Sequence, residues 1–311
     1  MTASRQAIRM WAAIPSLERV AKAVALAVVV GIGINHVYWA IVQWPLGDMA
    51  IYLGAADRIR AGQALYDYAT PSYATYWYAP WFAYAWVPLT YVPRIVTAIL
   101  WSAILVVATG GVAWRLARLG SFAAIVLSVL IAAPLFAVSA GGNTQALLVL
   151  FLMFGLDRRS GPIWVALAAS LKFTPILFVL VYLRRGEWAR AGFAIALTVV
   201  LVGPAFVLGF DPMKAVGSGS EAPSLFGIAP ALYAASVVLA LGLGLLVDQR
   251  FARLAAAGAA VLALPRLFIY DVTLIAAGAP PVVTARGHRR MPVPREVPPL
   301  AVTRPGAPDP R

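Results

Sequence analysis

The sequence predicts an all-α, polytopic membrane protein. Hydrophobic residues make up 62% of its 311 residues and charged residues only 12%, so a soluble domain could not bury this much apolar surface. Several apolar runs come near the ~20 residues that cross a bilayer core. Charged residues stand mainly at the ends of these runs. The net charge of +13 therefore suits loops that flank membrane spans, and no basic stripe indicates nucleic-acid binding.

The first apolar run, 23–42, predicts a signal anchor that begins in the cytoplasm. Arg and Lys residues precede it, as they do on the cytoplasmic side of membrane spans. The run is too long for the core of a signal peptide and has no convincing cleavage site. The chain after Trp44 is therefore expected on the outer face of the plasma membrane.

Residues 45–93 are predicted to lie along that outer face. Eight of the twelve Tyr fall between positions 52 and 91, and this mixture of aromatic and polar residues suits neither a simple span nor a free loop. Positions from Asp48 to Ile59 recur at helical spacing, and Gly62 follows as a stop signal, which predicts an interfacial helix. A second such helix is expected over 80–91.

The segment 162–183 is expected to form two half-length helices that meet near Lys172. Arginines on both flanks place both ends in the cytoplasm, and Pro175 favours a break, so that each half is ~15 Å long. Irregular backbone at that depth needs a protein-lined cavity. The alternative is one full span, which would invert the orientation of everything after it. The other expected membrane helices are 94–118, 121–138, 143–156, 189–208, 228–247 and 253–277.

Two domains are expected. The membrane-embedded domain comprises 1–278. Residues 279–311 hold six Arg and many Pro, a composition that predicts a disordered tail. The threading of the last helix puts this tail outside.

Asp48 and Tyr78 belong to the most suggestive segment for chemistry. An acid beside many amphipathic rings indicates a site for a sugar or a lipid headgroup. Two plainer interpretations stay open. Asp48 could cap the interfacial helix with its carboxylate, and the Tyr and Trp side chains could be membrane-interface anchors.

Other polar residues interrupt apolar segments and are candidates for binding. Lys172 could hold a phosphate, since a cation at this depth usually faces a cavity or a partner; the alternatives are snorkelling to the interface or pairing with a carbonyl. Asn143 and Gln145 could hydrogen-bond sugar hydroxyls or cap the helix that follows. Tyr270 and Asp271 mark a second acidic site, or an ion pair between helices.

Several segments, in this order, resemble glycosyltransferase family 87, the membrane mannosyltransferases of the GT-C class that use polyprenol-phosphate mannose. The resemblance covers roughly residues 20–277. It is carried by the stretches GDMAIYLGAADRIRAGQALYD, YWYAPWFAYAWVPLTYVP, GGNTQALLVLFLMFGL, ALAASLKFTPILFVLVYLRRGEWAR and LPRLFIYDVTLI.

The resemblance implies a GT-C-like bundle and an inverting sugar transfer. Asp48 takes the place of the general base on the acceptor hydroxyl, and Lys172 and Arg58 are candidates to hold the departing phosphate. It implies a lipid-linked sugar donor, a glycan or glycolipid acceptor, and no redox cofactor. The sequence shows no dedicated metal ligands, and whether a metal is needed stays open. Family members continue through further spans after the segment of Asp271, so the chain is expected to be shortened at its C-terminus.

Two other functions stay open. A transporter or flippase for a lipid-linked or small polar substrate would also use Lys172, Asp271 and a broken helix. A non-catalytic scaffold is the third possibility.

Overall fold

A computed structural model describes residues 14–42, 46–69, 75–119, 121–217 and 225–280 of the chain. Every regular element in these ranges is a helix, either α or 3₁₀. The all-α prediction is therefore confirmed for this part of the chain. The described residues all belong to one compact unit that ends at Pro281. The predicted tail lies outside the described residues except for positions 279 and 280.

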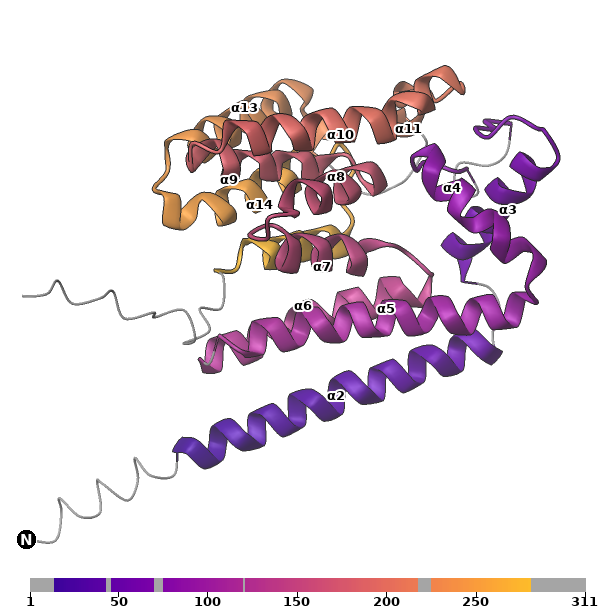
Figure 1. Cartoon of the computed structure of the whole chain (residues 1–311). Helices are drawn as coiled ribbons and strands as arrows, with labels where there is room; N and C mark the ends of the chain where they lie inside the picture. Colours follow the sequence, from indigo (N-terminus) through magenta and orange to yellow (C-terminus); the bar gives the residue numbers. More distant parts are fainter. Residues whose placement is uncertain (1–13, 43–45, 70–74, 120, 218–224, 281–311) are drawn as a thin grey trace, which may run out of the picture. The chain divides into compact units, whose positions relative to one another are not determined.

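Three long helices pack side by side and form one layer of the unit (Figure 1). Apolar side chains dominate all three. Ser121 begins the third helix by accepting a hydrogen bond of 3.1 Å from the Ala124 amide, as an N-cap serine does. The three are α2 (Ile14–Val42), α5 (Arg94–Ala117) and α6 (Phe122–Ala140).

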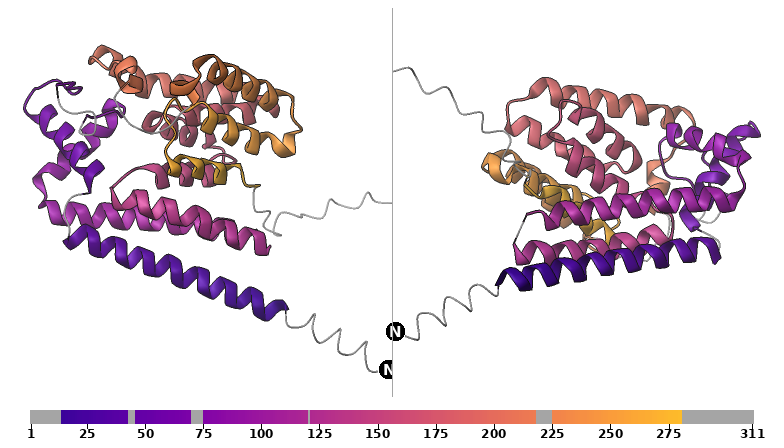
Figure 2. Two further views of the ribbon diagram at one scale, coloured as in Figure 1. Left: turned by 180° about the vertical axis from the view of Figure 1, so that it is seen from behind. Right: turned by 60° about the horizontal axis from the view of Figure 1, so that its bottom comes forward.

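The second group of helices is shorter and packs around α8 and α14 (Figures 1 and 2). Its buried faces are rich in Ala and Leu, which allows close helix contacts. The group consists of α7 (Gln145–Gly155), α8 (Gly161–Leu171), η3 (Thr174–Phe178), α9 (Val179–Arg184), α10 (Trp188–Val207), α13 (Pro230–Leu246), α14 (Ala252–Leu262) and η5 (Ile269–Gly278). The minor elements are α11 (Pro212–Gly217), α12 (Leu225–Ile228) and η4 (Gln249–Phe251).

The segment predicted to follow the membrane surface contains α3 (Gly47–Arg60), α4 (Pro80–Trp86) and η2 (Val87–Tyr91). Both expected helices are present, and the chain turns at Gly62, whose φ of 67° is readily adopted by glycine. The ring of Tyr52 on α3 lies 4.9 Å from that of Phe82 and 5.1 Å from that of Trp86. These ring contacts pack α3 against α4.

The prediction of two half-length helices around Lys172 is confirmed. Helix α8 ends at Leu171, and Lys172 is extended, with φ −152° and ψ 122°. The break precedes Pro175 instead of lying on it, because Pro175 stands in the first turn of η3, where a proline is tolerated. Arg185, after the second half, bonds to Asp157, before the first half, at 3.0 Å. Both flanks therefore lie together, which rules out the single-span alternative.

The prediction of one helix over 253–277 is wrong. Helix α14 ends at Leu262, and η5 begins only at Ile269. Pro265 lies between them and lacks the amide hydrogen that would continue a helix. The chain turns back here, since Arg253 before the break donates to the Ala279 carbonyl after it at 3.1 Å. Ala279, the first residue of the predicted tail, therefore lies at the same end of the unit as Arg253; the rest of the tail from 281 onward lies outside the described residues.

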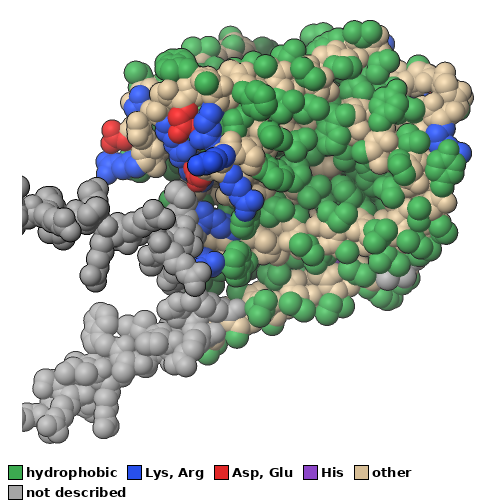
Figure 3. Space-filling view, viewed as in Figure 1, with side chains coloured by type: hydrophobic (Ala, Val, Ile, Leu, Met, Phe, Trp, Pro, Cys, Tyr) green, Lys and Arg blue, Asp and Glu red, His purple; other side chains and the backbone are tan. Residues whose placement is uncertain are grey.

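Two helices, Arg94–Ala117 and Trp188–Val207, are long and apolar enough to cross a membrane, judged by length and composition alone. The other apolar helical stretches found in the described residues have 10–17 residues. Hydrophobic side chains cover most of the face in Figure 3, while Lys, Arg, Asp and Glu gather mainly toward its left edge. On α10, exposed apolar residues include Val199, Val200 and Val207.

Candidate functional site

Asp48 lies in the first turn of α3 but does not cap it. The N-cap position is Leu46, and the cap makes no side-chain hydrogen bond, so the capping interpretation of Asp48 is wrong. Instead its backbone amide donates to the Gly141 carbonyl at 2.8 Å. Its carboxylate accepts a 2.6 Å hydrogen bond from the Asn143 side-chain amide. Asp48 therefore joins α3 to the loop between α6 and α7.

Asn143 has the capping role expected from the sequence and also contacts Asp48; its predicted contact with a sugar hydroxyl stays a prediction. Its side-chain oxygen accepts from the Gln145 amide at 2.9 Å, which caps the start of α7. The NH2 group at the other end of the same carboxamide is thereby turned toward Asp48. Gly142 allows this approach: its φ is +84°, and a Cβ there would come within 3.1 Å of the Met49 amide nitrogen.

The environment of Asp48 adjusts its acidity in two directions. Burial disfavours the charged carboxylate and raises its pKa, while the Asn143 hydrogen bond and the charge of Lys172 lower it; the net pKa lies above the usual value. A half-buried carboxylate with a raised pKa is a stronger base once it is ionised. Lys172 is also close enough to Asp48 to act on it electrostatically.

Lys172 forms an ion pair with Asp271, whose side chain is fully buried. The ion-pair interpretation of Asp271 is confirmed, and it gives Lys172 a carboxylate partner. The second carboxylate oxygen of Asp271 accepts from the Phe268 amide at 2.9 Å. Lys172 Nζ also lies 5.2 Å from the centre of the Tyr270 ring, within the range of a cation–π contact.

Arg266 is a second cation at the same carboxylate, and the sequence reasoning did not assign it to the site. It lies on the irregular backbone between α14 and η5 and interacts electrostatically with Asp271 and Tyr270. Lys172 and Arg266 therefore face two carboxylates, Asp271 and Asp48, so the charges of the cluster balance. The signal was available, because Arg266 interrupts an apolar segment as Lys172 does.

Tyr78 connects the two halves of the site. It accepts a 3.0 Å hydrogen bond from the fully buried Tyr52 hydroxyl. Burial, followed by the negative charge of Asp48, raises the pKa of Tyr78, so its hydroxyl keeps its proton. Tyr78 also lines the same cavity as Lys172. Tyr52 was not among the predicted site residues.

This cavity has a volume of about 330 Å³ and mostly apolar walls. Phe206 and Phe210 lie on one wall, and Lys172 and Tyr78 supply polar groups. Trp77, Tyr78 and Ala79, just before α4, line it, and two hydrogen bonds join Ala79 and the start of α4 to the end of α8. The Ala79 amide donates to the Ser170 carbonyl at 3.4 Å, and the Trp81 indole N–H donates to the Ser170 hydroxyl at 3.0 Å. An apolar chamber with a cation suits an amphipathic anion.

Of the predicted site residues, only Lys172 and Tyr78 line this cavity; Asp48, Asn143, Tyr270 and Asp271 do not line it, and Gln145 and Arg58 are held by other contacts. Gln145 is fully buried and donates to the Thr273 hydroxyl at 3.3 Å and the Tyr270 carbonyl at 3.4 Å, so it holds α7 to η5. Arg58 donates to the Leu65 carbonyl at 3.3 Å. Among the described residues no recorded contact joins Arg58 to Lys172, and the structure does not bring it into the cluster.

Within the described ranges, no group of three or more His, Asp or Glu side chains could hold a metal ion. The site consists of the Asp48 and Asp271 carboxylates, a tyrosine pair and two cations, with Lys172 and Tyr78 at an apolar cavity. No protein-family model, curated protein or solved structure matches the chain.

Proposed function

We propose that the chain is a polytopic membrane glycosyltransferase of the GT-C class, similar to glycosyltransferase family 87. It transfers a sugar, mannose by the resemblance, from a polyprenol-phosphate donor to a glycan or glycolipid acceptor. The observation that carries the proposal is the half-buried Asp48 carboxylate, which Asn143 holds at 2.6 Å within electrostatic range of Lys172, a cation from a distant part of the chain. Asp48 supplies a base, and Lys172 supplies a cation at an apolar cavity.

The chemistry needs these two charges on opposite sides of one carbon atom. Asp48 takes the proton from the acceptor hydroxyl while that oxygen bonds to the anomeric carbon of the sugar. The bond from this carbon to the phosphate oxygen breaks, and its electron pair leaves on the polyprenol phosphate. Lys172 and Arg266 stabilise the charge on the leaving phosphate. The apolar cavity takes the first part of the lipid chain.

The proposed membrane placement puts the arginine-rich end in the cytoplasm and Asp48 toward the outer face. Asp157, Arg185 and Arg253 meet at the first end, as expected of loops on the positive side of a membrane. On this placement α5 and α10 span the bilayer. The halves around Lys172, with α8 only ~16 Å long, are re-entrant.

The proposal is tested by sugar transfer in membranes supplied with radiolabelled polyprenol-phosphate mannose. Asp48→Asn keeps the shape of the side chain but removes the base, and transfer should fall by a factor of roughly 10²–10⁴. Asp57→Asn is the matched control, since Asp57 is an exposed acid on the same helix that pairs with Arg60 at 3.1 Å. Equal transfer by wild type and Asp48→Asn would remove Asp48 from the mechanism.

A transporter or flippase is the second candidate, favoured by the buried Lys172–Asp271 pair on broken helices. Such a protein would move a lipid-linked substrate across proteoliposome membranes without consuming it. Translocation that persists in Asp48→Asn, with no transfer by either protein, would support this alternative over the enzyme.

A further inference from the structure

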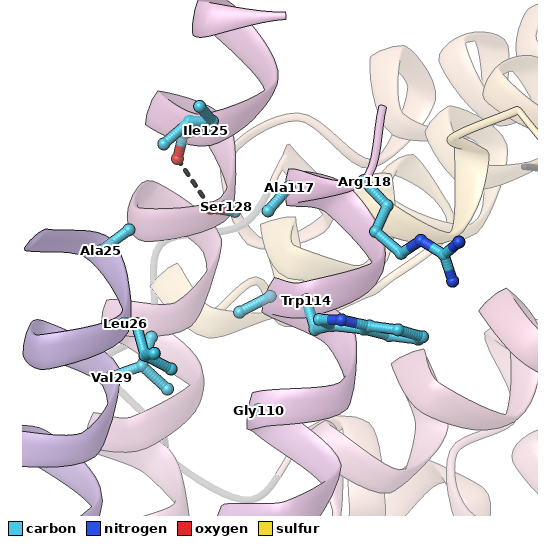
Figure 4. A pocket seen from close by; sticks show the side chains of 10 residues that line it. Ala25, Leu26, Val29, Gly110, Trp114, Ala117, Arg118, Ile125 and Ser128 are labelled. Atoms are coloured by element: carbon cyan, nitrogen blue, oxygen red, sulfur yellow. Dashed lines mark hydrogen bonds between the residues drawn. The ribbon is translucent and has the colours of Figure 1, made fainter. Parts of the chain in front are cut away.

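A second cavity lies among α2, α5 and α6, away from the proposed active site (Figure 4). Its volume is about 320 Å³. Ala25 and Val29 of α2, Gly110 and Ala117 of α5, and Ile125 of α6 form its walls. All three contributing helices belong to the long-helix layer. We call this cavity the groove, and no step of the proposed sugar transfer uses it.

The walls of the groove are almost entirely apolar. The one hydroxyl, on Ser128, donates to the Ile125 carbonyl at 2.7 Å, as the dashed line in Figure 4 shows. It is therefore already satisfied by the wall itself. Among the described lining residues, Arg118 is the one with a charged side chain. The groove thus has apolar walls, and its one charged residue, Arg118, stands at the edge, with its side chain extending away from the labelled residues of α2 (Figure 4).

The cation has no countercharge in the described part of the chain. Arg118 is exposed and stacks over the Trp114 ring, with its guanidinium carbon 4.8 Å from the ring centre. The positive charge of neighbouring Arg115 acts at the same end of α5. Arg115 donates to the Pro280 carbonyl at 3.3 Å, but its other terminal nitrogen is buried without a partner in the described residues. This end of the groove carries an excess of positive charge.

The length of the groove fits one leaflet of a bilayer. Trp and Arg side chains concentrate where a span meets the headgroups, so Trp114 and Arg118 mark that level on α5. From Arg118 to Gly110 the helix rises ~12 Å, at about 1.5 Å per residue. Half of a hydrocarbon core of roughly 30 Å is ~15 Å. An acyl chain that enters beside Arg118 would therefore lie along the groove through most of a leaflet.

We infer that this groove is a binding site for an anionic phospholipid, with an acyl chain along Gly110 and the phosphate at Arg118. Charge complementarity favours an anionic lipid over a zwitterionic one, because a zwitterionic headgroup would bring its own positive charge close to Arg115 and Arg118. One basic residue beside an anionic lipid gives a preference of about fivefold. The inference rests on the membrane placement proposed above and does not depend on sugar transfer.

The test is lipid retention, measured by native mass spectrometry on the full chain purified in a neutral detergent. Phosphatidylglycerol and phosphatidylcholine with the same acyl chains are compared. Wild type should retain phosphatidylglycerol about fivefold better. Arg118→Gln should abolish the preference. Arg159→Gln should keep it, because Arg159 is an exposed arginine outside the groove.

A second variant blocks the channel and leaves the charge in place. A Cβ at Gly110 would meet no atom within 4 Å, so Gly110→Leu extends into the cavity without displacing the helices. It should lower retention of both lipids. Gly192→Leu on α10 is the matched control, since a Cβ there also meets no atom within 4 Å and Gly192 does not line the groove.

Three outcomes would overturn the inference. Equal retention of the two lipids by wild type would remove the selectivity. If Arg159→Gln and Arg118→Gln lowered the preference for phosphatidylglycerol equally, the preference would come from the basic end of the protein as a whole and not from the groove. If the wild type carried a second copy of the chain and Gly110→Leu lost it, the groove would be a surface for helix–helix association and not a lipid site. Release of the chain from membranes by alkaline carbonate would contradict the membrane placement. Selective lipid retention without any sugar transfer would contradict only the proposed enzymatic function.

Discussion

Lys172 and Asp271 form an ion pair although 99 residues separate them in the chain. Lys172 stands immediately after the end of α8, and Asp271 lies in the first turn of η5. Each residue follows the end of an α-helix: Lys172 follows α8, and Asp271 follows the irregular segment after α14. The pair therefore joins the two irregular segments of the fold and fixes the cationic side of the proposed site.

Removing Lys172 should destabilise the protein more than removing Asp271. Asp271 is fully buried, while the Lys172 side chain is 25% exposed. Lys172→Met strands a buried carboxylate and should cost about 3 kcal/mol of unfolding free energy. Asp271→Asn leaves a lysine that can reach water and should cost about 1 kcal/mol. Unfolding by SDS in mixed micelles measures both, and the reverse order would contradict the assigned burial.

Loss of the Asn143 carboxamide should move the acid limb of sugar transfer to higher pH. Its hydrogen bond lowers the pKa of Asp48, so Asn143→Ala raises that pKa further above the usual value. Since the base must be unprotonated, more alkaline conditions are then needed for half-maximal rate. A pH–rate profile checks the shift, with Asp57→Asn as the control. An unmoved limb would mean that another group controls it.

Gly142→Ala should weaken both folding and transfer. The φ of +84° is unfavourable for alanine, and the new Cβ would lie 3.1 Å from the Met49 amide nitrogen. We expect a loss of about 1–2 kcal/mol in unfolding free energy and reduced transfer, since Asp48 is displaced. Gly47→Ala is the control, because Gly47 also adjoins Asp48, does not have a positive φ, and a Cβ there would meet no atom within 4 Å. Similar losses in the two variants would show that backbone conformation is not the cause.

Tyr78→Phe should cost more stability than Tyr52→Phe. Tyr52 donates to Tyr78, and the Tyr52 hydroxyl belongs to a fully buried residue. Tyr52→Phe removes the bond together with its buried donor and should cost about 1 kcal/mol. Tyr78→Phe leaves that donor unpaired, which raises the cost toward ~2 kcal/mol. Equal values in the same SDS unfolding assay would show that water reaches the Tyr52 hydroxyl.

Asp157 should make stability depend on pH in the acid range. Burial opposes its ionisation, but hydrogen bonds and charges from Arg253 and Arg185 more than compensate, so its pKa lies below the usual value. A depressed carboxyl pKa contributes stability that is present above the unfolded-state pKa and is lost as pH falls through the folded-state pKa. Thermal unfolding of Asp157→Asn should therefore vary less over that range. Identical pH dependence in wild type would contradict this.

Local signals in the sequence were sufficient for the interfacial helix and for the break near Lys172. Helical spacing from Asp48 and the stop at Gly62 identified α3. Arginines on both flanks of 162–183 indicated that its two ends lie on the same side. The same reasoning failed at 253–277. There the continuous apolar run predicts one helix, although Pro265 lacks the backbone N–H needed to continue a helix.

Contacts between distant segments were beyond the sequence. Asp48 and Asn143 were each identified as polar residues near helix starts, but nothing local indicates a bond across 95 positions. Arg58 stood on the favoured helix and had the right charge, yet its side chain turns to the Leu65 carbonyl. Which charges meet depends on how helices pack, and hydrophobic periodicity leaves that open.

The hydrogen bonds from Ala79 and Trp81 to Ser170 have a mechanical consequence. Ser170 is two positions ahead of Lys172, so the start of α4 and the cation are connected through a short stretch of backbone. If a lipid chain entered the cavity and displaced the start of α4, Lys172 would be displaced with it. In the proposed enzyme, accommodation of the lipid chain and positioning of the cation at the phosphate would then be coupled.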